Sequence, residues 1–186
     1  MKKFELTTDS IKRNGVTLYR IKSLIDFGDV KAGYFGGYVE KKENLSQSGD
    51  AWVYGNAEVY RNALVCDDAR VFGNARVSGN ARVSGNALVS SNAWVYGNAE
   101  VSGDACVSGD AWVSGDADYI YLKGFGSHNR STTMFRENGG NICVSCGCFS
   151  GTLEEFESKV KETHGSNKFA REYLALVEAA KIHFEV

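Results

Sequence analysis

A six-residue repeat runs without a break through the middle of this chain, over residues 51–118. Alanine takes the first position of every hexad from Ala51 to Ala117, and valine takes the third from Val53 to Val113. Most hexads close with Gly followed by Asn or Asp. A fixed period this short is typical of a solenoid, in which each repeat packs only against its neighbours.

Each hexad predicts one short strand and one corner. In Ala-x-Val the two apolar side chains point to one face of an extended strand, and the residue between them points to the other. Gly and Asn adopt left-handed backbone angles most easily, so they suit a tight corner. Three hexads close a triangular coil, which predicts a mainly β fold: a parallel β-helix of about four regular 18-residue coils. An amphipathic helix is excluded because period six does not give a stripe of period 3.6.

The open sheet edges at both ends of such a rod must be covered. Residues 1–50 predict an N-terminal cap with an irregular first coil. Asn14-Gly15 indicates a type I′ hairpin turn. Val39 and Leu45 lie six residues apart in the alanine register and are expected to belong to the irregular coil.

After the repeat, residues 119–186 predict a small α+β unit that docks on the other end of the rod. We expect three strands there, over residues 119–122, 132–136 and 142–149. A capping box formed by Thr152 and Glu155 begins a first helix, which Gly165 ends. A second helix is expected over residues 167–183.

Composition excludes several classes of function. The net charge is −2, so the chain lacks the basic surface of a nucleic-acid-binding protein, and a nucleic-acid partner is not expected. No apolar run is long enough for a membrane span, and the residues after Met1 lack the apolar run that a signal peptide needs, so neither is expected. An odd number of cysteines, five, without a recognisable secretion signal leads us to expect reduced thiols in a cytoplasm.

The flanking segments resemble those of hexapeptide-repeat proteins from bacteriophages, prophages and enterobacteria. At the N-terminal end the similarity lies in residues 18–22, 27–33, 36–40 and 44–46, and near the C-terminus it lies in residues 146–156. The resemblance implies a left-handed β-helix, a phage or prophage type of protein and the cytoplasm of a bacterial host. Such proteins are labelled acyltransferases on the strength of their repeats, or they carry no assigned activity.

Hexapeptide acyltransferases use a histidine general base at a groove between subunits, and this chain departs from that pattern. Residues 51–118 contain neither a histidine nor an inserted loop. His164 and His183 are expected at helix C-termini, where positive charge is favourable. His128 remains the weak catalytic candidate. It lies with Arg130 in the polar loop 127–132, which is a candidate for binding a phosphate, an acyl group or a small nucleotide; an exposed turn is the alternative.

Three cysteines near the C-terminus form a weak metal candidate. Cys143 and Cys146 have the Cys-x-x-Cys spacing of a zinc site, and Cys148 follows them. No second cysteine or histidine pair lies nearby at a suitable spacing. Strand alternation places Cys146 and Cys148 on one face with Ile142 and Val144, as buried hydrophobic thiols. We therefore expect structural cysteines, with no metal and no cofactor.

The 18-residue coil also predicts which outward side chains stack on one another. We call one predicted face the aromatic face. Its two adjoining columns are Glu58, Arg76, Trp94, Trp112 and Tyr60, Ser78, Tyr96, Ser114. The first column predicts an ion pair, then Arg on Trp, then Trp on Trp. Trp, Tyr and Arg dominate binding energies at interfaces, and contiguous apolar patches are seldom left exposed.

The expected binding residues are therefore Trp94, Trp112, Tyr60, Tyr96 and Arg76, together with Arg130 of the polar loop. The alternatives for the aromatic face are stiffening of the stack, self-association, a foreign partner, or cover by the chain's own C-terminal unit.

The leading hypothesis is a non-enzymatic interaction or scaffold protein that forms a homo-oligomer or binds another protein. The resemblance to phage-borne proteins implies a host protein as that partner, with interference in host defence. The alternatives are an acyltransferase-like enzyme that uses His128, and capture of a small nucleotide by the loop 127–132.

Overall fold

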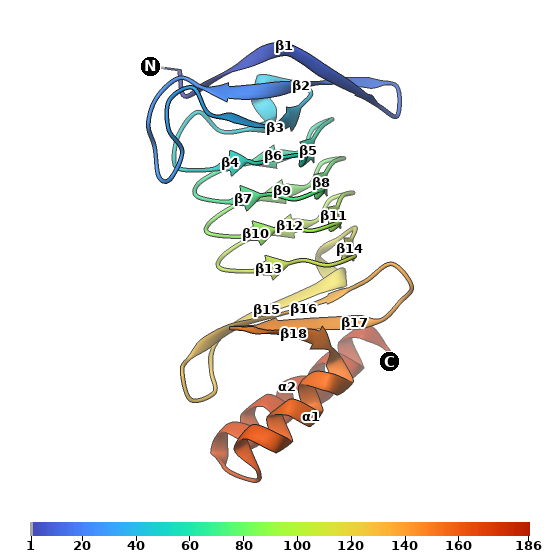
Figure 1. Cartoon of the computed structure of the whole chain (residues 1–186). Helices are drawn as coiled ribbons and strands as arrows, with labels where there is room; N and C mark the ends of the chain where they lie inside the picture. Colours follow the sequence, from blue (N-terminus) through green and yellow to red (C-terminus); the bar gives the residue numbers. More distant parts are fainter. Residues whose placement is uncertain (1) are drawn as a thin grey trace.

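The computed structural model describes residues 2–186 and is mainly β, with a β-solenoid of about four turns at its centre (Figure 1). Three columns of two-residue parallel strands make its walls. The first column contains β5 (Glu58–Val59), β8 (Arg76–Val77), β11 (Trp94–Val95) and β14 (Trp112–Val113). The second contains β4 (Trp52–Val53), β7 (Arg70–Val71), β10 (Leu88–Val89) and β13 (Cys106–Val107). The third contains β6 (Leu64–Val65), β9 (Arg82–Val83) and β12 (Glu100–Val101).

The strand register confirms the coil length predicted from the repeat. Trp94 pairs with Arg76 on one side and with Trp112 on the other, each 18 residues away. The repeat valines from Val53 to Val113 are fully buried, and each such side chain stabilises the rod by about 1.5–3 kcal/mol relative to exposure.

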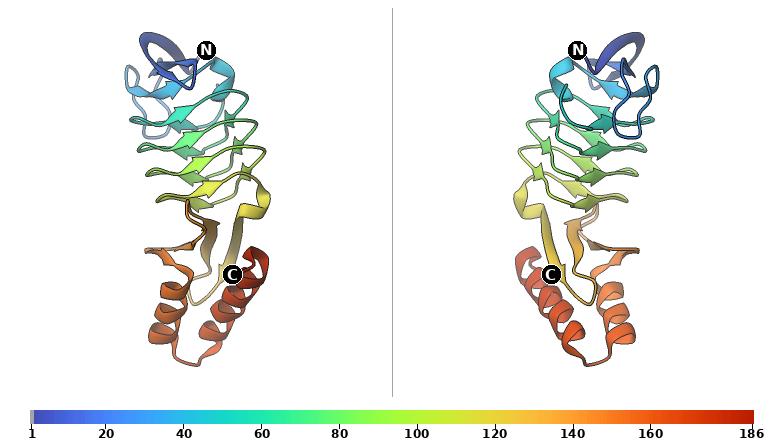
Figure 2. Two further views of the ribbon diagram at one scale, coloured as in Figure 1. Left: turned by 90° about the vertical axis from the view of Figure 1, so that its right-hand side faces the viewer. Right: turned by 90° about the vertical axis from the view of Figure 1, so that its left-hand side faces the viewer.

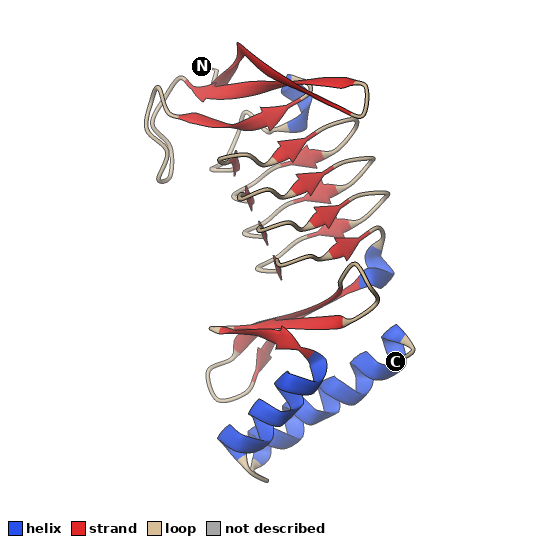
Figure 3. Ribbon diagram, turned by 45° about the vertical axis from the view of Figure 1, so that its right-hand side comes forward, coloured by secondary structure: helices blue, strands red, loops and turns tan. Residues whose placement is uncertain are grey.

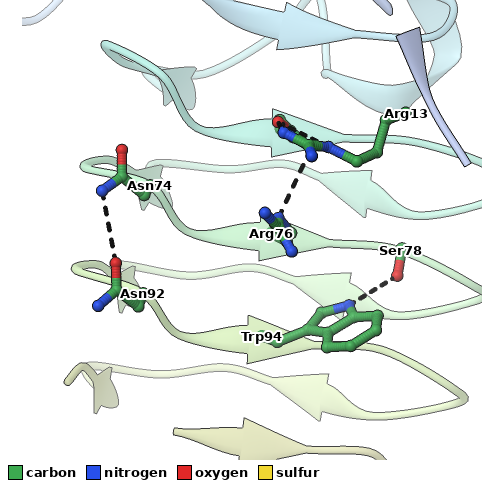
Figure 4. A network of polar contacts seen from close by, with 7 residues as sticks. Arg13, Asn74, Arg76, Ser78, Asn92 and Trp94 are labelled. Atoms are coloured by element: carbon green, nitrogen blue, oxygen red, sulfur yellow. Dashed lines mark hydrogen bonds and ion pairs between the residues drawn. The ribbon is translucent and has the colours of Figure 1, made fainter. Parts of the chain in front are cut away.

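Asparagine ladders run along the corners of the coils. The side-chain amide of Asn62 donates to Asn80 at 3.1 Å, and that of Asn80 donates to Asn98 at 2.9 Å. A second ladder joins Asn74 to Asn92 at 3.4 Å (Figure 4). The last asparagine of this ladder donates to Asp110 at 3.0 Å. Each of these asparagines except Asn98 thus donates a side-chain hydrogen bond to the corner of the next coil, which adds to the backbone bonds between coils.

An antiparallel hairpin covers the N-terminal end of the rod (Figure 3). It consists of β1 (Phe4–Arg13) and β2 (Val16–Ser23), and β2 pairs with β3 (Phe35–Val39). Both turn residues have positive φ, 48° at Asn14 and 81° at Gly15, as a type I′ turn requires. Because β3 pairs in parallel with β5, the hairpin extends the first column of the solenoid.

The first coil departs from the predicted register. Val39 pairs with Val59 and Leu45 bridges to Val65, so both occupy the valine register and not the expected alanine register. The spacing here is 20 residues because the corner between Leu45 and Val53 is longer than a regular one. A short 3-10 helix, η1 (Lys42–Asn44), lies in the same coil.

The C-terminal unit begins with the 3-10 helix η2 (Asp116–Asp118), which ends the rod. A four-stranded antiparallel sheet follows, made of β15 (Tyr119–Phe125), β16 (Arg130–Arg136), β17 (Ile142–Cys146) and β18 (Phe149–Thr152). Two helices complete the chain, α1 (Leu153–His164) and α2 (Lys168–Phe184). The sheet lies between the rod and the two helices (Figure 2).

The two faces of this sheet belong to different hydrophobic cores. Phe135 and Cys143 pack with the valines of the rod. Met134 and Val144 pack with the helices, against residues such as Phe156. The sheet therefore covers the open end of the solenoid on one side and supports the helices on the other.

The expected strand over residues 142–149 is in fact two strands. Gly147 has a φ of 62° and turns the chain between β17 and β18. The capping box is confirmed, since Thr152 accepts from the Glu155 amide at 3.2 Å and its own amide donates to the Glu155 carboxylate at 2.8 Å. Neither helix in residues 2–186 is both long and apolar enough to cross a membrane.

Candidate functional sites

The aromatic face contains a stack of tryptophans, as the register predicts. The rings of Trp94 and Trp112 lie 5.8 Å apart and are inclined by only 15°. Tyr96 packs beside them, with its ring centroid 4.8 Å from that of Trp94. All three side chains are half-buried, so each still presents part of its ring to solvent.

A buried carboxylate lies at the N-terminal end of the same face. Glu58 is only 4% exposed and pairs with Arg76, with 3.7 Å between Oε2 and Nε, as the stacking predicts. It also accepts from Nε of Arg13 at 2.8 Å, and this contact raises the pKa of the Arg13 guanidinium. The second partner was not predicted, because the end of the hairpin reaches the rod only through the pairing of β3 with β5.

Two details of the aromatic face correct the sequence-based expectation. Tyr60 is 2% exposed and belongs to the core, because it lies in the coil that the N-terminal hairpin covers. Within residues 2–186, Arg76 forms no cation–π contact, so the expected packing of Arg76 on Trp94 is absent. The indole of Trp94 instead donates to the Ser78 hydroxyl of the preceding coil at 3.1 Å (Figure 4).

Two adjoining hollows form a groove along this face, and both are lined by Arg76 and Asn92. The hollow nearer the N-terminal cap has a volume of about 470 Å³ and reaches Arg13 of the hairpin. The hollow nearer the C-terminal unit has a volume of about 350 Å³ and is also lined by Trp94, Asp110, Ala111, Trp112 and Asn138. The backbone amide of Asn138 donates to the carbonyl of Asp110 at 3.1 Å, so the C-terminal unit covers the end of the groove that lies nearest to it.

The second column of the solenoid is covered at its N-terminal end. Trp52 is fully buried beneath Phe4 and Phe27, whose ring centroids lie 6.1 and 5.3 Å from its own. Asp29 accepts from the Tyr54 hydroxyl at 2.9 Å and lies 3.5 Å from the Arg70 guanidinium. The segment between β2 and β3 therefore covers the N-terminal end of this face, whereas the aromatic face keeps an open groove.

A separate pocket lies in the C-terminal unit, between the sheet and the helices. It has a volume of about 420 Å³. His128 and Arg130 both line it, so the structure brings together two residues that the sequence singled out. The other lining residues are Ser127, Cys146, Cys148, Phe149, Phe156, Lys159, Val160, Thr163, His164 and Tyr173. We call this cavity the C-terminal pocket.

The helix residues of this pocket were not predicted as site residues. Phe156, Lys159, Val160 and Thr163 recur at helical spacing on one side of α1, and this pattern is the signal that was available. His164 ends α1 as expected, but its ring also stacks on Tyr173, with centroids 6.0 Å apart and an inclination of 29°. Sequence alone could not distinguish this face from an ordinary core stripe.

Tyr173 is buried and lines the C-terminal pocket, and its hydroxyl has two protein neighbours. It donates to the carbonyl of Phe125 at 3.3 Å and lies 3.8 Å from the Cys146 sulfur. Burial, assisted by the contact with Cys146, raises the pKa of Tyr173 to about 12. The phenol is therefore neutral at physiological pH.

The three candidate metal cysteines lie in different environments. Cys146 packs with the helices, whereas Cys143 packs toward the rod, where burial raises the pKa of its thiol to about 12. Cys148 is exposed, which corrects the expectation that it shares a buried face with Cys146; the turn at Gly147 reverses its direction. Within residues 2–186, no three candidate ligand side chains lie close enough to hold a metal ion together.

Comparisons with known proteins agree with the solenoid. The family described as "YdcK Beta solenoid repeat" matches three overlapping stretches, residues 63–79, 69–84 and 81–97. The chain is also similar to the protein named "Uncharacterized acetyltransferase YdcK" from Escherichia coli (strain K12), with 39% identity over 51 residues. That match covers 27% of this chain and 15% of YdcK, so the chain spans only a small part of its relative. Together with the register of the coils, the family match defines this chain as a β-solenoid repeat protein.

Proposed function

We propose that this protein is a non-enzymatic interaction protein whose aromatic face binds a protein partner. The observation that carries the proposal is the open groove, which runs from Arg13 past Arg76 to Trp112 and keeps half-buried tryptophans on its surface. Trp and Arg together are the side chains that contribute most to binding energy at protein interfaces.

The rod suits this role because it holds the groove rigidly. Its coils are joined by backbone hydrogen bonds and by the asparagine ladders, so the groove loses little conformational freedom when a partner binds. The first partner to test is a second copy of the chain. The second is a host protein, which the similarity of the flanking segments to phage-borne proteins supports.

The test is the double variant Trp94→Asp with Trp112→Asp, measured by light scattering. We expect the wild-type chain to be an oligomer and the variant to be a smaller species with unchanged far-UV circular dichroism. Phe72→Asp is the matched control, because Phe72 is an aromatic residue, 38% exposed, on the second column and outside the groove. It should leave the mass unchanged.

If light scattering shows that the wild-type chain is a monomer, the partner to test is a different protein. Capture from a bacterial lysate, identified by mass spectrometry, should then succeed with the wild-type chain and with Phe72→Asp but not with the tryptophan variant. If the tryptophan variant behaves like the wild-type chain in both assays, the aromatic face is not an interface and the proposal fails.

Acyl transfer is the second candidate function, favoured by the name of the relative YdcK and by the position of His128 in a pocket. The His128 Nδ1 atom lies 2.9 Å from the Ser127 hydroxyl, and no carboxylate lines the pocket to orient the imidazole. An acyl-coenzyme A titration of the wild-type chain and of His128→Ala tests this function. Saturable binding that the substitution abolishes would favour the enzyme over the interaction protein.

A further inference from the structure

The C-terminal pocket has apolar walls. Phe149 and Phe156, whose ring centroids lie 5.3 Å apart, line it together with Val160 and the ring of Tyr173. The phenol hydroxyl of Tyr173 is already engaged with the carbonyl of Phe125. The walls therefore suit an apolar group, because a ligand that lies against them leaves few polar protein groups without a hydrogen bond.

The polar side chains that line the same pocket are cations or neutral hydrogen-bonding groups. Arg130, Lys159, His128 and His164 line it, and no aspartate or glutamate does. Lys159 forms an ion pair with Glu162 at 2.8 Å. The lining of the pocket therefore contains cationic side chains and no carboxylate, and Lys159 is neutralised by Glu162 outside it.

Arg130 carries the strongest part of this argument. Over residues 2–186, its guanidinium forms no ion pair and no side-chain hydrogen bond, although the side chain is half-buried. It packs directly over Gly147, where any Cβ would collide with it, so the glycine turn makes room for the arginine. A guanidinium that has no protein partner and lines an apolar cavity without carboxylates is well suited to bind an anion through two parallel N–H groups.

We propose that the C-terminal pocket binds a small amphipathic anion, which is an apolar chain or ring that ends in a carboxylate or a phosphate. The apolar part lies against Phe149, Phe156 and Val160, and the anionic end contacts Arg130 and the hydroxyl of Ser127. A volume of about 420 Å³ is within the range of small-molecule sites. This site is independent of the groove on the aromatic face, so either proposal can fail without the other.

Isothermal titration calorimetry with decanoate, decyl phosphate and 1-decanol, each below its aggregation or solubility limit, tests the site. We expect saturable binding of at least one of the two anions and binding of the neutral alcohol at least 10-fold weaker. The preference between the two anions shows whether the pocket favours a carboxylate or a phosphate head group. Arg130→Gln should weaken binding of the anion at least 10-fold.

Arg171→Gln is the matched control, because it removes the same charge from an exposed position of α2 outside the pocket. It should leave the affinity unchanged, and circular dichroism should show that both variants are folded. The bound anion should also slow the alkylation of Cys148, the exposed thiol of the pocket, by several-fold. Equal affinities for decanoate, decyl phosphate and decanol, no saturable anion binding, or equal effects of the two arginine substitutions would each overturn the proposal.

Discussion

Arg13 joins the N-terminal hairpin to the rod by pairing with Glu58, 45 residues along the chain. Nε of Arg13 lies 2.8 Å from one carboxylate oxygen of Glu58, and its Nη2 atom contacts the other. The carboxylate is almost completely buried, whereas the arginine is 36% exposed. The pair therefore anchors a half-exposed cap to a buried charge of the first regular coil.

Replacing Arg13 by Met should lower the free energy of unfolding by about 2 kcal/mol, because a buried carboxylate then keeps only the longer contact with Arg76. Urea unfolding measures the change. The additional substitution Glu58→Gln should restore part of the loss, because it removes the unpaired charge. Arg82→Met, on an exposed arginine of the third column, is the control and should change stability by less than about 0.5 kcal/mol. Equal effects of Arg13→Met and Arg82→Met would show that the pair is not a structural anchor.

Gly79 tests the stacking of the corners. Its φ is 71°, and a Cβ there would lie 2.9 Å from the backbone nitrogen and oxygen of Gly97 in the next coil. Gly55 has a similar φ of 59°, but its nearest such neighbour is at 3.8 Å, an ordinary contact. Both Gly→Ala substitutions should cost about 1 kcal/mol for the left-handed backbone. Gly79→Ala should cost at least about 1 kcal/mol more in thermal unfolding, because the coils must separate. Identical melting temperatures for the two variants would mean that the coils separate to accommodate the added Cβ at position 79 with no loss of stability.

Lys3 should make stability depend on alkaline pH. It is 2% exposed, and burial lowers its pKa from 10.5 to about 8, although Asp50 and Asp68 partly oppose this shift. Between pH 8 and 10.5 the unfolded chain holds a proton on Lys3 that the folded chain has lost, so this group raises stability as pH rises. The gain is at most about 3 kcal/mol.

The measurement compares the wild-type chain with Lys3→Met by urea unfolding at pH 7 and at pH 10.5. The free energy of unfolding of the variant minus that of the wild-type chain should fall over this interval, because only the wild-type chain gains. The other titrating groups are common to both proteins and cancel. A difference that stays constant with pH would contradict the assignment of a depressed pKa to Lys3.

The cysteines should differ in reactivity. Cys148 is exposed, whereas Cys143 is buried and its pKa is raised to about 12, so its reactive thiolate is scarce at neutral pH. With iodoacetamide at pH 7.5, peptide mass spectrometry should find Cys148 modified at least 10-fold faster than Cys143. In urea the two rates should converge. Equal rates in the folded protein would place the turn at Gly147 in doubt.

The repeat determined the solenoid, because its period leaves little freedom. An alanine and a valine two residues apart, followed by a left-handed corner, place both apolar side chains on one face of each strand, and a coil that closes after three hexads buries them. The register then follows, which is why the stack of Trp94 on Trp112 and the pair of Glu58 with Arg76 were predictable from residue numbers alone.

Only the tertiary structure decided what covers the rod and where pockets lie. The Arg13 contact, the burial of Tyr60 and the assembly of the C-terminal pocket depend on contacts between segments with no shared period. In the same way, Cys146 and Cys148 were separated by a single turn at Gly147 that strand alternation could not reveal. A periodic sequence specifies its own neighbours at a fixed distance along the chain, whereas caps and pockets arise from non-periodic contacts that only the packing of the whole chain selects.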